Sequence, residues 1–333
     1  MTKISIIIPL FNAENYLQEC LESVRKQTFH DWECIIADDG STDKSIQIAT
    51  EFVNADNRFK MFSIEHSGNP QNVRHFARLN ATGDWLLDLD ADDFLAPNCL
   101  EKLIERQKQT NADVVLLQLN LFDNETDQTL QKIPTTSFDF AQLCSGDQAV
   151  MLTVGQWEIP NNGLFRKDLY NLQENYSSNL LNLDEYAQRI VLFNAKTVAF
   201  SDAGYFYRQH DQSLTKHITE RYFYTIHSDK LLEEFIISKF GKHSKEAIKA
   251  KNASIKRLLY LYVRFFQVKK QFSKSDQKCI NTLFLEHFKN LSAKEIWSSD
   301  LPVFKKCVLT LPAIVISCIA CFYAQYKCYQ LNT

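Results

Sequence analysis

The sequence predicts an α/β protein with a doubly wound, mostly parallel sheet, followed by a helical C-terminal region. Short apolar runs, typical of strands buried on both faces, alternate with amphipathic helical segments through the first 125 residues. Two of these runs end in a pair of aspartates, as expected where a parallel strand leads into a functional loop. Beyond residue 215 the alternation stops and helical spacing dominates. We therefore expect a catalytic domain over 1–214, with halves 1–125 and 126–214, and a separate region over 215–333.

The expected elements follow one another in regular alternation. Strands are predicted at 3–9, 32–37, 59–65, 85–89 and 114–121, and helices at 13–27, about 42–54, 71–81 and 97–109. Asn12 is expected to cap the first helix, and Ser41 or Thr42 the second. Pro97 suits the first turn of the fourth helix, where its missing N–H costs nothing.

Four carboxylates follow the apolar start of the fourth strand: Asp88, Asp90, Asp92 and Asp93. Because strand side chains alternate, the first three are expected on one face. Crowded carboxylates repel one another unless a hard cation neutralises them, and their oxygens suit Mg²⁺ or Mn²⁺. The alternative is a solvated acidic loop without a function.

A second acidic pair, Asp38 and Asp39, ends the second strand. Ligands of doubly wound sheets bind outside the carboxyl ends of the strands. We therefore expect the two acidic clusters to meet in one crevice.

Three sequence blocks resemble the signatures of the family 2 glycosyltransferases. They are Ile-Ser-Ile-Ile-Ile-Pro-Leu-Phe-Asn at 4–12, Ile-Ile-Ala-Asp-Asp-Gly-Ser-Thr-Asp at 35–43, and Asp-Ala-Asp-Asp at 90–93. The resemblance implies a GT-A fold and an inverting transfer from a nucleotide-activated sugar, with Mn²⁺ or Mg²⁺ as cofactor. It covers the first 125 residues well, and residues up to about 215 more loosely.

By resemblance, Asp39 accepts a hydrogen bond from the uracil ring of a UDP-sugar, and Arg74 binds phosphate. The full set of implied nucleotide-sugar contacts is Pro9, Phe11, Asn12, Glu14, Asp38, Asp39, Gly68, Arg74, Asp90, Ala91 and Arg208. Alternatives stay open: Asn12 as a turn residue, the two aspartates as helix caps, and Arg74 as a solvated side chain. His75 and Ala77 depart from the Asn and Gly common in the family, which affects the local backbone more than the charge of Arg74.

The resemblance also implies a metal site. Asp92 would ligate the ion directly, and Asp90 would contact the ribose or reach the ion through water. His210 would be a ligand or lie in the second layer of contacts. A lone histidine is as often structural.

An inverting transfer needs a general base, which the family supplies from a Glu-Asp pair opening a helix. Asp184 aligns best, with Leu183 in place of the usual Glu, and Glu185 is the second candidate. Acidic residues are also common in first helical turns because of the helix dipole.

Charge divides the chain. Residues 1–214 hold 17 Lys+Arg against 31 Asp+Glu, whereas residues 215–333 hold 20 against 9. No nucleic-acid motif appears, so the basic region is expected to face anionic lipid. The uncharged run at 307–326 is long enough to lie in or just span a bilayer, and a buried helical hairpin is the alternative.

Scattered cysteines and a short N-terminal apolar run indicate a cytoplasmic enzyme at the inner face of the membrane.

These observations predict a metal-dependent enzyme that moves one sugar from UDP-sugar to a saccharide or lipid-linked acceptor in surface-polysaccharide synthesis. The Gln-x-x-Arg-Trp motif of processive synthases is absent from the sequence. The alternatives are a nucleotidyltransferase on a similar sheet and a non-catalytic sugar-nucleotide-binding protein. The run at 9–14 lacks the Gly and basic residues of a triphosphate loop.

Overall fold

The computed structural model describes residues 3–135, 137–170, 183–210 and 218–292, together with Ile296 and Pro302; the side chains of Leu183 and Asp184 lie outside it. The chain divides into two compact units, one of residues 1–179 and 183–211, the other of 180–182 and 212–333. The domain boundary expected after residue 214 stays a prediction, because residues 211–217 are outside the described part.

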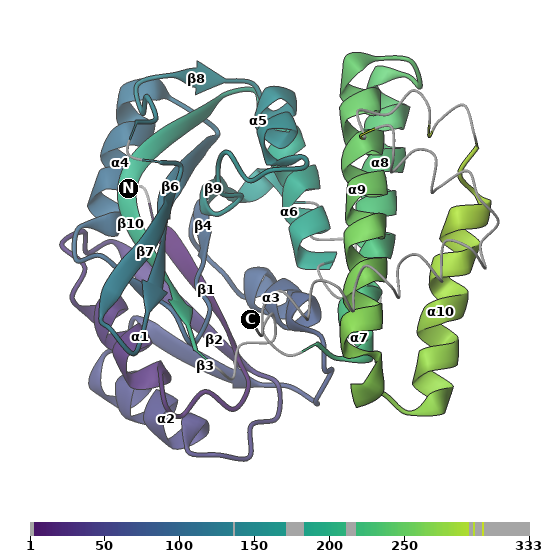
Figure 1. Cartoon of the computed structure of the whole chain (residues 1–333). Helices are drawn as coiled ribbons and strands as arrows, with labels where there is room; N and C mark the ends of the chain where they lie inside the picture. The colour runs from purple at the N-terminus through teal and green to yellow at the C-terminus, as the bar shows by residue number, and fades with distance from the viewer. Residues whose placement is uncertain are drawn as a thin grey trace. The chain divides into compact units, whose positions relative to one another are not determined.

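Four parallel strands form the first half of the sheet in unit 1 (Figure 1). They are β1 (Ile4–Leu10), β2 (Trp32–Asp38), β3 (Phe59–Ser63) and β4 (Trp85–Asp88), in the order β3-β2-β1-β4. β1 pairs with both β2 and β4, so the loops that follow these three strands leave the same edge. The expected α/β fold is confirmed in this half.

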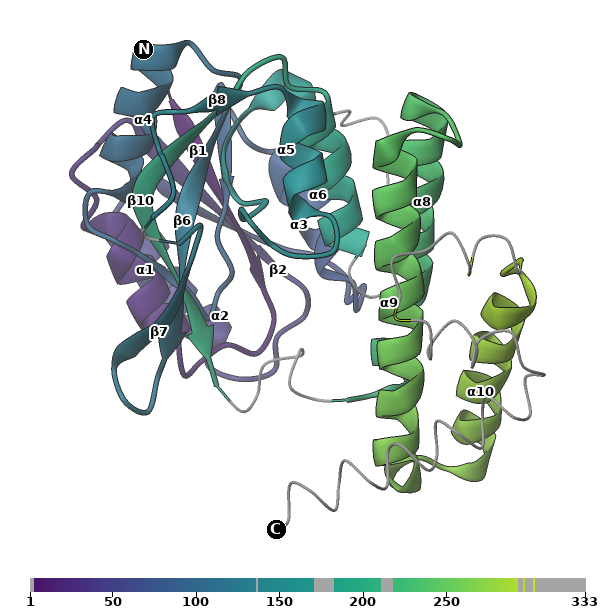
Figure 2. The ribbon, with the colours of Figure 1, turned by 45° about the horizontal axis from the view of Figure 1, so that its top comes forward.

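The second half of the sheet is mixed. The long strands β6 (Val114–Asp123) and β10 (Val198–Gln209) run parallel and side by side (Figure 2). β9 (Gly163–Arg166) lies antiparallel between β4 and β6. Three further strands pair antiparallel with β6 or β10: β5 (Phe94–Leu95), β7 (Gln128–Ile133) and β8 (Leu143–Cys144). None of β5 and β7–β10 was predicted, because their pairing depends on distant residues.

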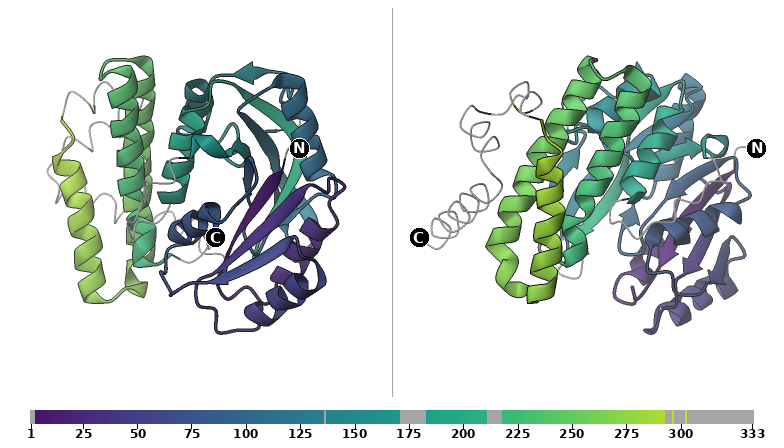
Figure 3. Two further views of the ribbon diagram at one scale, coloured as in Figure 1. Left: turned by 180° about the vertical axis from the view of Figure 1, so that it is seen from behind. Right: turned by 90° about the vertical axis from the view of Figure 1, so that its right-hand side faces the viewer.

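Helices cover both faces of the sheet (Figures 1 and 3). α1 (Leu17–Arg25), α2 (Ser45–Ala55) and α4 (Cys99–Thr110) bury apolar side chains in one shared core, which contains the side of β1 that carries Ile6 and Ile8. α3 (Pro70–Leu79) packs on the other side, where Ile7, Ile35 and Leu86 meet it. α5 (Gly146–Thr153) packs on α6 (Leu183–Phe193), which in turn contacts α3. The 3₁₀ turn η1 (Lys167–Leu169) follows β9.

The predicted order of the first nine elements is confirmed, but three helix starts were wrong. Asn12 does not cap α1, which begins at Leu17 after a turn. Ser41 and Thr42 do not cap α2, because the helix begins at Ser45, whose N–H donates to Asp43. Cys99, not Pro97, opens α4. In the first two cases the residues that could have capped a helix, Asn12, Ser41 and Thr42, bind one another across two loops instead.

Unit 2 is helical in its described part. α7 (Glu220–Phe223), α8 (Thr225–Phe240), α9 (Lys245–Val268), the turn η2 (Lys269–Gln271) and α10 (Lys274–Lys289) follow in order. Their core is rich in aromatic rings, with Phe223, Tyr262 and Phe284 fully buried. In the described residues no helix is long and apolar enough to cross a membrane, and the segment 307–326 lies outside them.

Candidate active site

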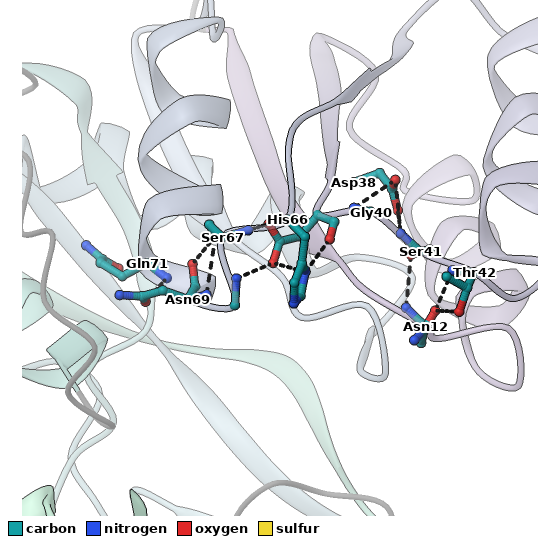
Figure 4. A network of polar contacts seen from close by, with 11 residues as sticks. Asn12, Asp38, Gly40, Ser41, Thr42, His66, Ser67, Asn69 and Gln71 are labelled. Atoms are coloured by element: carbon teal, nitrogen blue, oxygen red, sulfur yellow. Dashed lines mark hydrogen bonds and ion pairs between the residues drawn. The ribbon is translucent and has the colours of Figure 1, made fainter.

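The loops after β1 and β2 are joined by reciprocal hydrogen bonds (Figure 4). The Asn12 N–H donates to Ser41 Oγ at 3.0 Å, and the Thr42 N–H donates to Asn12 Oδ1 at 2.8 Å. Asn12 has a positive φ of 47°, a conformation that asparagine tolerates better than most residues. Glu14 continues the pattern by accepting from the Lys44 N–H at 3.0 Å. Asn12 and Glu14 were expected beside the nucleotide. Their side chains bind backbone N–H groups of the loop after β2, and so hold the two loops together at this edge of the site.

Asp38 and Asp39 have different surroundings. Asp38 is buried and accepts from the N–H groups of Gly40 and Ser41, so it closes the turn after β2. Asp39 accepts from Ser67 N–H at 2.6 Å and Gly68 N–H at 3.0 Å, one bond on each oxygen. Asp39 Oδ2 also lies 3.2 Å from His66 Nδ1, so Oδ1 is the oxygen that keeps a lone pair for a ligand.

An aromatic pair lies next to Asp39. Phe11 is 48% exposed and stacks on His66, with ring centroids 4.7 Å apart. His66 Nδ1 lies 2.7 Å from the Asp39 carbonyl oxygen (Figure 4). Pro9, near the end of β1, precedes this loop. It is half-buried and lies opposite Ala37 of β2 in the sheet. An exposed ring beside a carboxylate suits a flat base with an N–H group.

The strand β4 ends at Asp88, so the alternation expected to align Asp88, Asp90 and Asp92 does not extend past it. Asp90 instead forms an ion pair with Arg74 of α3, whose Nη2 lies 2.5 Å from Asp90 Oδ1. One turn along α3, Arg78 binds Asp88 in the same way. Arg74 and Arg78 are both buried, which fixes their guanidinium groups at the edge of the sheet.

Asp92 faces His210. Its Oδ2 lies 2.9 Å from His210 Nε2, and the His210 side chain is only 8% exposed. Burial and the neighbouring Asp90 raise the pKa of Asp92, while the hydrogen bond from His210 acts in the opposite direction. The other ring nitrogen of His210 is buried and has no hydrogen-bond partner in the part of the chain that the structure describes.

These donors fit a divalent cation that a substrate helps to hold. Among the described residues, no three His, Cys, Asp or Glu side chains are grouped closely enough to hold an ion alone. One carboxylate and one imidazole oriented toward each other are the incomplete set expected where phosphate oxygens and water complete the coordination.

A buried network holds the turn that carries Asp90 and Asp92. Tyr205 O–H donates to Asp93 at 2.6 Å and the Arg208 N–H donates to it at 2.8 Å. Burial, Asp92 and Asp90 together raise the pKa of Asp93 well above its usual range. The Arg208 guanidinium donates to the Asp92 carbonyl, Asn124 and Glu19, so it supports the turn from behind. Ala91, within the turn, is 7% exposed.

A pocket opens between α3, the end of β4 and the start of α6. Among the described residues that line it, the side-chain amides of two Gln and two Asn accompany five charged side chains. The charged residues are Arg74, Arg78, Asp88, Asp90 and Glu185. Glu185 is 40% exposed and lies 3.4 Å from Arg189. Asp184 belongs to the same helical turn, and its side chain is outside the described part.

The tertiary structure thus brings together predicted residues from four loops and from helix α3. Asp39 and Gly68 meet directly, as do Arg74 with Asp90 and Asp92 with His210. Sequence reasoning missed His66 and Arg78 as site residues, and it counted Asp88 only as one carboxylate of the acidic cluster. Only the spacing could have indicated Arg78, which is one helical turn from Arg74.

A GT-A sheet with carboxylates at its carboxyl edge and a polar pocket beside them is the architecture of a glycosyltransferase. The chain belongs to glycosyl transferase family 2, whose family model matches residues 5–190. It is therefore an enzyme of that family, and the alternatives of a nucleotidyltransferase and a non-catalytic binding protein are set aside.

Relatives agree with this membership. Glycosyltransferase GlyG of Streptococcus pneumoniae is 31% identical over 223 residues, covering 64% of this chain and 73% of GlyG. The poly(ribitol-phosphate) beta-N-acetylglucosaminyltransferase TarS of Staphylococcus aureus is 25% identical over 72% of this chain, which spans only 45% of TarS. The crystal structure of TarS 1–349 in complex with UDP-GlcNAc superposes with a TM-score of 0.69 at 19% identity, over 98% of this chain and 92% of that one. This likeness shows the fold.

Proposed function

We propose that the enzyme transfers one sugar from a UDP-sugar, with inversion, to a saccharide or lipid-linked saccharide in surface-polysaccharide synthesis. The observation that carries this proposal is the convergence of Asp39, Asp90 and Asp92 on one edge of the sheet beside a polar pocket. TarS, which has the same fold, binds UDP-GlcNAc in its crystal structure, and this supports a UDP-sugar as the donor.

The uracil ring binds beside Phe11 and hydrogen-bonds through its N3–H to Asp39. The exposed Phe11 ring offers a stacking surface, and Asp39 is fixed by the Ser67 and Gly68 amides. A carboxylate that accepts from an N–H favours uracil over cytosine, which has no N–H at that ring position.

The diphosphate binds near Asp90, Asp92 and His210. When bound there, Mn²⁺ or Mg²⁺ supplies positive charge that stabilises the departing UDP. Asp92 and His210 would hold the ion. Arg74, which is paired with Asp90, orients that carboxylate and adds positive charge next to the phosphates.

Asp184 or Glu185 takes the proton from the acceptor hydroxyl as it attacks the anomeric carbon. Both belong to the first turn of α6, and Glu185 lines the pocket. The attack comes from the face opposite UDP, so no covalent intermediate with the enzyme is needed.

We propose that the basic region over 215–333 keeps the enzyme at the cytoplasmic face of a membrane, where lipid-linked acceptors are found. Its excess of Lys and Arg supports this placement, because anionic lipids attract basic segments.

Calorimetric titration of UDP tests the proposal, first with Mn²⁺ and then with a chelator. We expect binding that weakens at least about tenfold without the metal, which corresponds to about 1.4 kcal/mol. Asp39→Asn should weaken binding in both conditions, whereas Asp92→Asn should abolish only the metal dependence. A wild type that binds no UDP in either condition would contradict the proposed donor.

A further inference from the structure

Arg78 and Asp88 form a partly buried ion pair that the reaction proposed above does not use. Arg78 comes from α3 and is 4% exposed, and Asp88 ends β4 with its side chain 17% exposed. Both residues line the pocket that also contains Arg74, Asp90 and Glu185.

This pair retains unused hydrogen-bonding capacity. Arg78 Nη2 donates to Asp88 Oδ2, but Arg78 Nε and Asp88 Oδ1 are buried without a hydrogen-bond partner among the described residues. An unsatisfied buried donor or acceptor costs roughly as much as a lost hydrogen bond, so such a pair calls for an explanation. A hydroxyl group is both donor and acceptor, and can satisfy both atoms together.

Contact with an aromatic ring explains the position of the Arg78 guanidinium only in part. The Arg78 guanidinium lies 4.7 Å from the centre of the Tyr170 ring, which supports one of its faces. Tyr170 in turn exchanges a hydrogen bond with Gln188, another residue of the pocket. The Tyr170 ring holds the Arg78 guanidinium in this direction, and within the described ranges the Nε–H finds no partner.

The composition of the pocket indicates the chemistry of its ligand. Among the described residues no apolar side chain lines it, and the charged ones are two arginines and three carboxylates. A net negative lining disfavours a second anion and suits a neutral molecule rich in hydroxyl groups. Asp88 is two residues from Asp90, beside the proposed diphosphate site, which is where the sugar of a nucleotide donor must lie.

We propose that Arg78 and Asp88 recognise hydroxyl groups of the transferred sugar and make the enzyme selective for a neutral UDP-hexose. The carboxylate accepts from one hydroxyl, and the guanidinium Nε–H donates to the same or an adjacent oxygen. Both atoms are buried, so each side chain must turn toward the pocket to meet the sugar, and the broad χ2 torsion of aspartate permits this for Asp88. This inference rests on the UDP-sugar donor proposed above.

The test compares UDP with UDP-glucose, UDP-galactose, UDP-N-acetylglucosamine and UDP-glucuronate by calorimetry on the full chain with Mn²⁺. The main variant is Arg78→Met with Asp88→Leu, because replacing both partners of a buried ion pair by apolar residues preserves folding better than removing one. Lys102→Met with Asp202→Leu removes an exposed ion pair of unit 1 and is the matched control. Thermal unfolding followed by circular dichroism verifies that each variant is folded.

In the wild type we expect one neutral UDP-hexose to bind at least about tenfold more tightly than UDP-glucuronate. In the double variant the affinity for UDP should stay within about twofold, while the preferred donor loses about tenfold. The control pair should leave every affinity unchanged. Asp88→Asn, which keeps the shape of the side chain, should shift the selectivity in the same direction and serves if the double variant does not fold.

Equal losses for UDP and for all donors would overturn the inference, because the pair would then act only on the nucleotide site. Unchanged selectivity in a folded double variant would overturn it as well, as would preferred binding of UDP-glucuronate by the wild type. A wild type that binds no UDP overturns the proposed donor, and with it this inference. The UDP titration thus separates failure of the function from failure of the subsite.

Discussion

Asp184 and Glu185 are neighbours in one helical turn, and a single change at each separates their roles. Asp184→Asn should bind UDP normally but lose about 10²–10⁴-fold in transfer, the usual contribution of a general base. Glu185→Gln should retain most of the activity, since the family pattern favours Asp184. Labelled sugar transfer to a cell extract, which supplies the acceptor, measures both variants. Normal turnover of Asp184→Asn together with an inactive Glu185→Gln would reverse the assignment.

Glu33 shows how a buried charge stabilises the opposite edge of the sheet. It is 2% exposed and accepts from Ser5 at 2.7 Å, Lys60 at 2.8 Å and the Thr82 N–H at 2.6 Å. Burial alone would raise the pKa of Glu33, but the bonds from Lys60, Ser5 and Thr82 outweigh burial and lower it well below its usual range.

Glu33→Gln should therefore lower the free energy of unfolding by roughly 2–3 kcal/mol at pH 7, because a charged acceptor is lost. A group with a lowered folded-state pKa stabilises above its unfolded pKa, near 4.3, and loses that contribution as pH falls through the folded value. The difference between wild type and variant should be constant above about pH 5 and shrink in more acidic solution. Urea unfolding at several pH values measures it, with the exposed Glu51→Gln as control. A difference that grows on acidification would contradict this account.

Among the elements, β9 decides how the two halves of the sheet join. A Cβ atom on Gly163 would lie 2.2 Å from the Val115 carbonyl oxygen and 2.8 Å from the Leu116 Cα, both backbone atoms that cannot turn away. Asn162, the preceding residue, donates to the Asp88 carbonyl at 3.2 Å and lines the pocket. The position of the strand and the shape of the pocket are thus coupled.

Gly163→Ala should destabilise unit 1 by roughly 2 kcal/mol, since overpacking forces the backbone apart. It should also weaken binding of the UDP-sugar more than binding of UDP, because Asn162 moves with β9. Urea unfolding and calorimetry measure the two effects. Gln131→Ala on the exposed strand β7 is the control and should change neither. An unchanged stability of Gly163→Ala would show that β9 can move freely.

At the scale of the whole molecule, the chain has two units with separate cores. The Phe284 ring is fully buried in unit 2, 5.0 Å from Tyr262 and 6.0 Å from Phe223 by ring centroids. Separate cores of this kind are expected to unfold as separate cooperative units.

Phe284→Ala should destabilise unit 2 by about 3–5 kcal/mol, because the cavity cannot collapse fully. Scanning calorimetry should then show one transition shifted to lower temperature and the other unchanged, with UDP affinity retained. Ile7→Ala in β1 should move the other transition instead. A parallel loss of UDP affinity in Phe284→Ala would contradict independent units.

Loop geometry could not be predicted from local sequence. Asn12, Ser41 and Thr42 looked like helix caps, because each is a good cap residue at the start of an apolar pattern. In the folded chain their partners are one another, across about thirty residues of sequence. Arg208 likewise matched a phosphate-binding position, and its contacts with Asn124 and Glu19 join strand β10 to the turn after β6 and to helix α1.

The sequence by itself determined the alternation of strands and helices, the acidic residues at the strand ends and the family. These follow from local apolar periodicity and from three short blocks, which need no knowledge of distant neighbours. Only the tertiary structure decided that β9 enters the sheet antiparallel, that Arg78 pairs with Asp88, and that His66 lies beside Asp39. Each of these depends on strand register and side-chain packing between residues far apart in the chain, where many pairings satisfy the same local pattern and the packed core selects one.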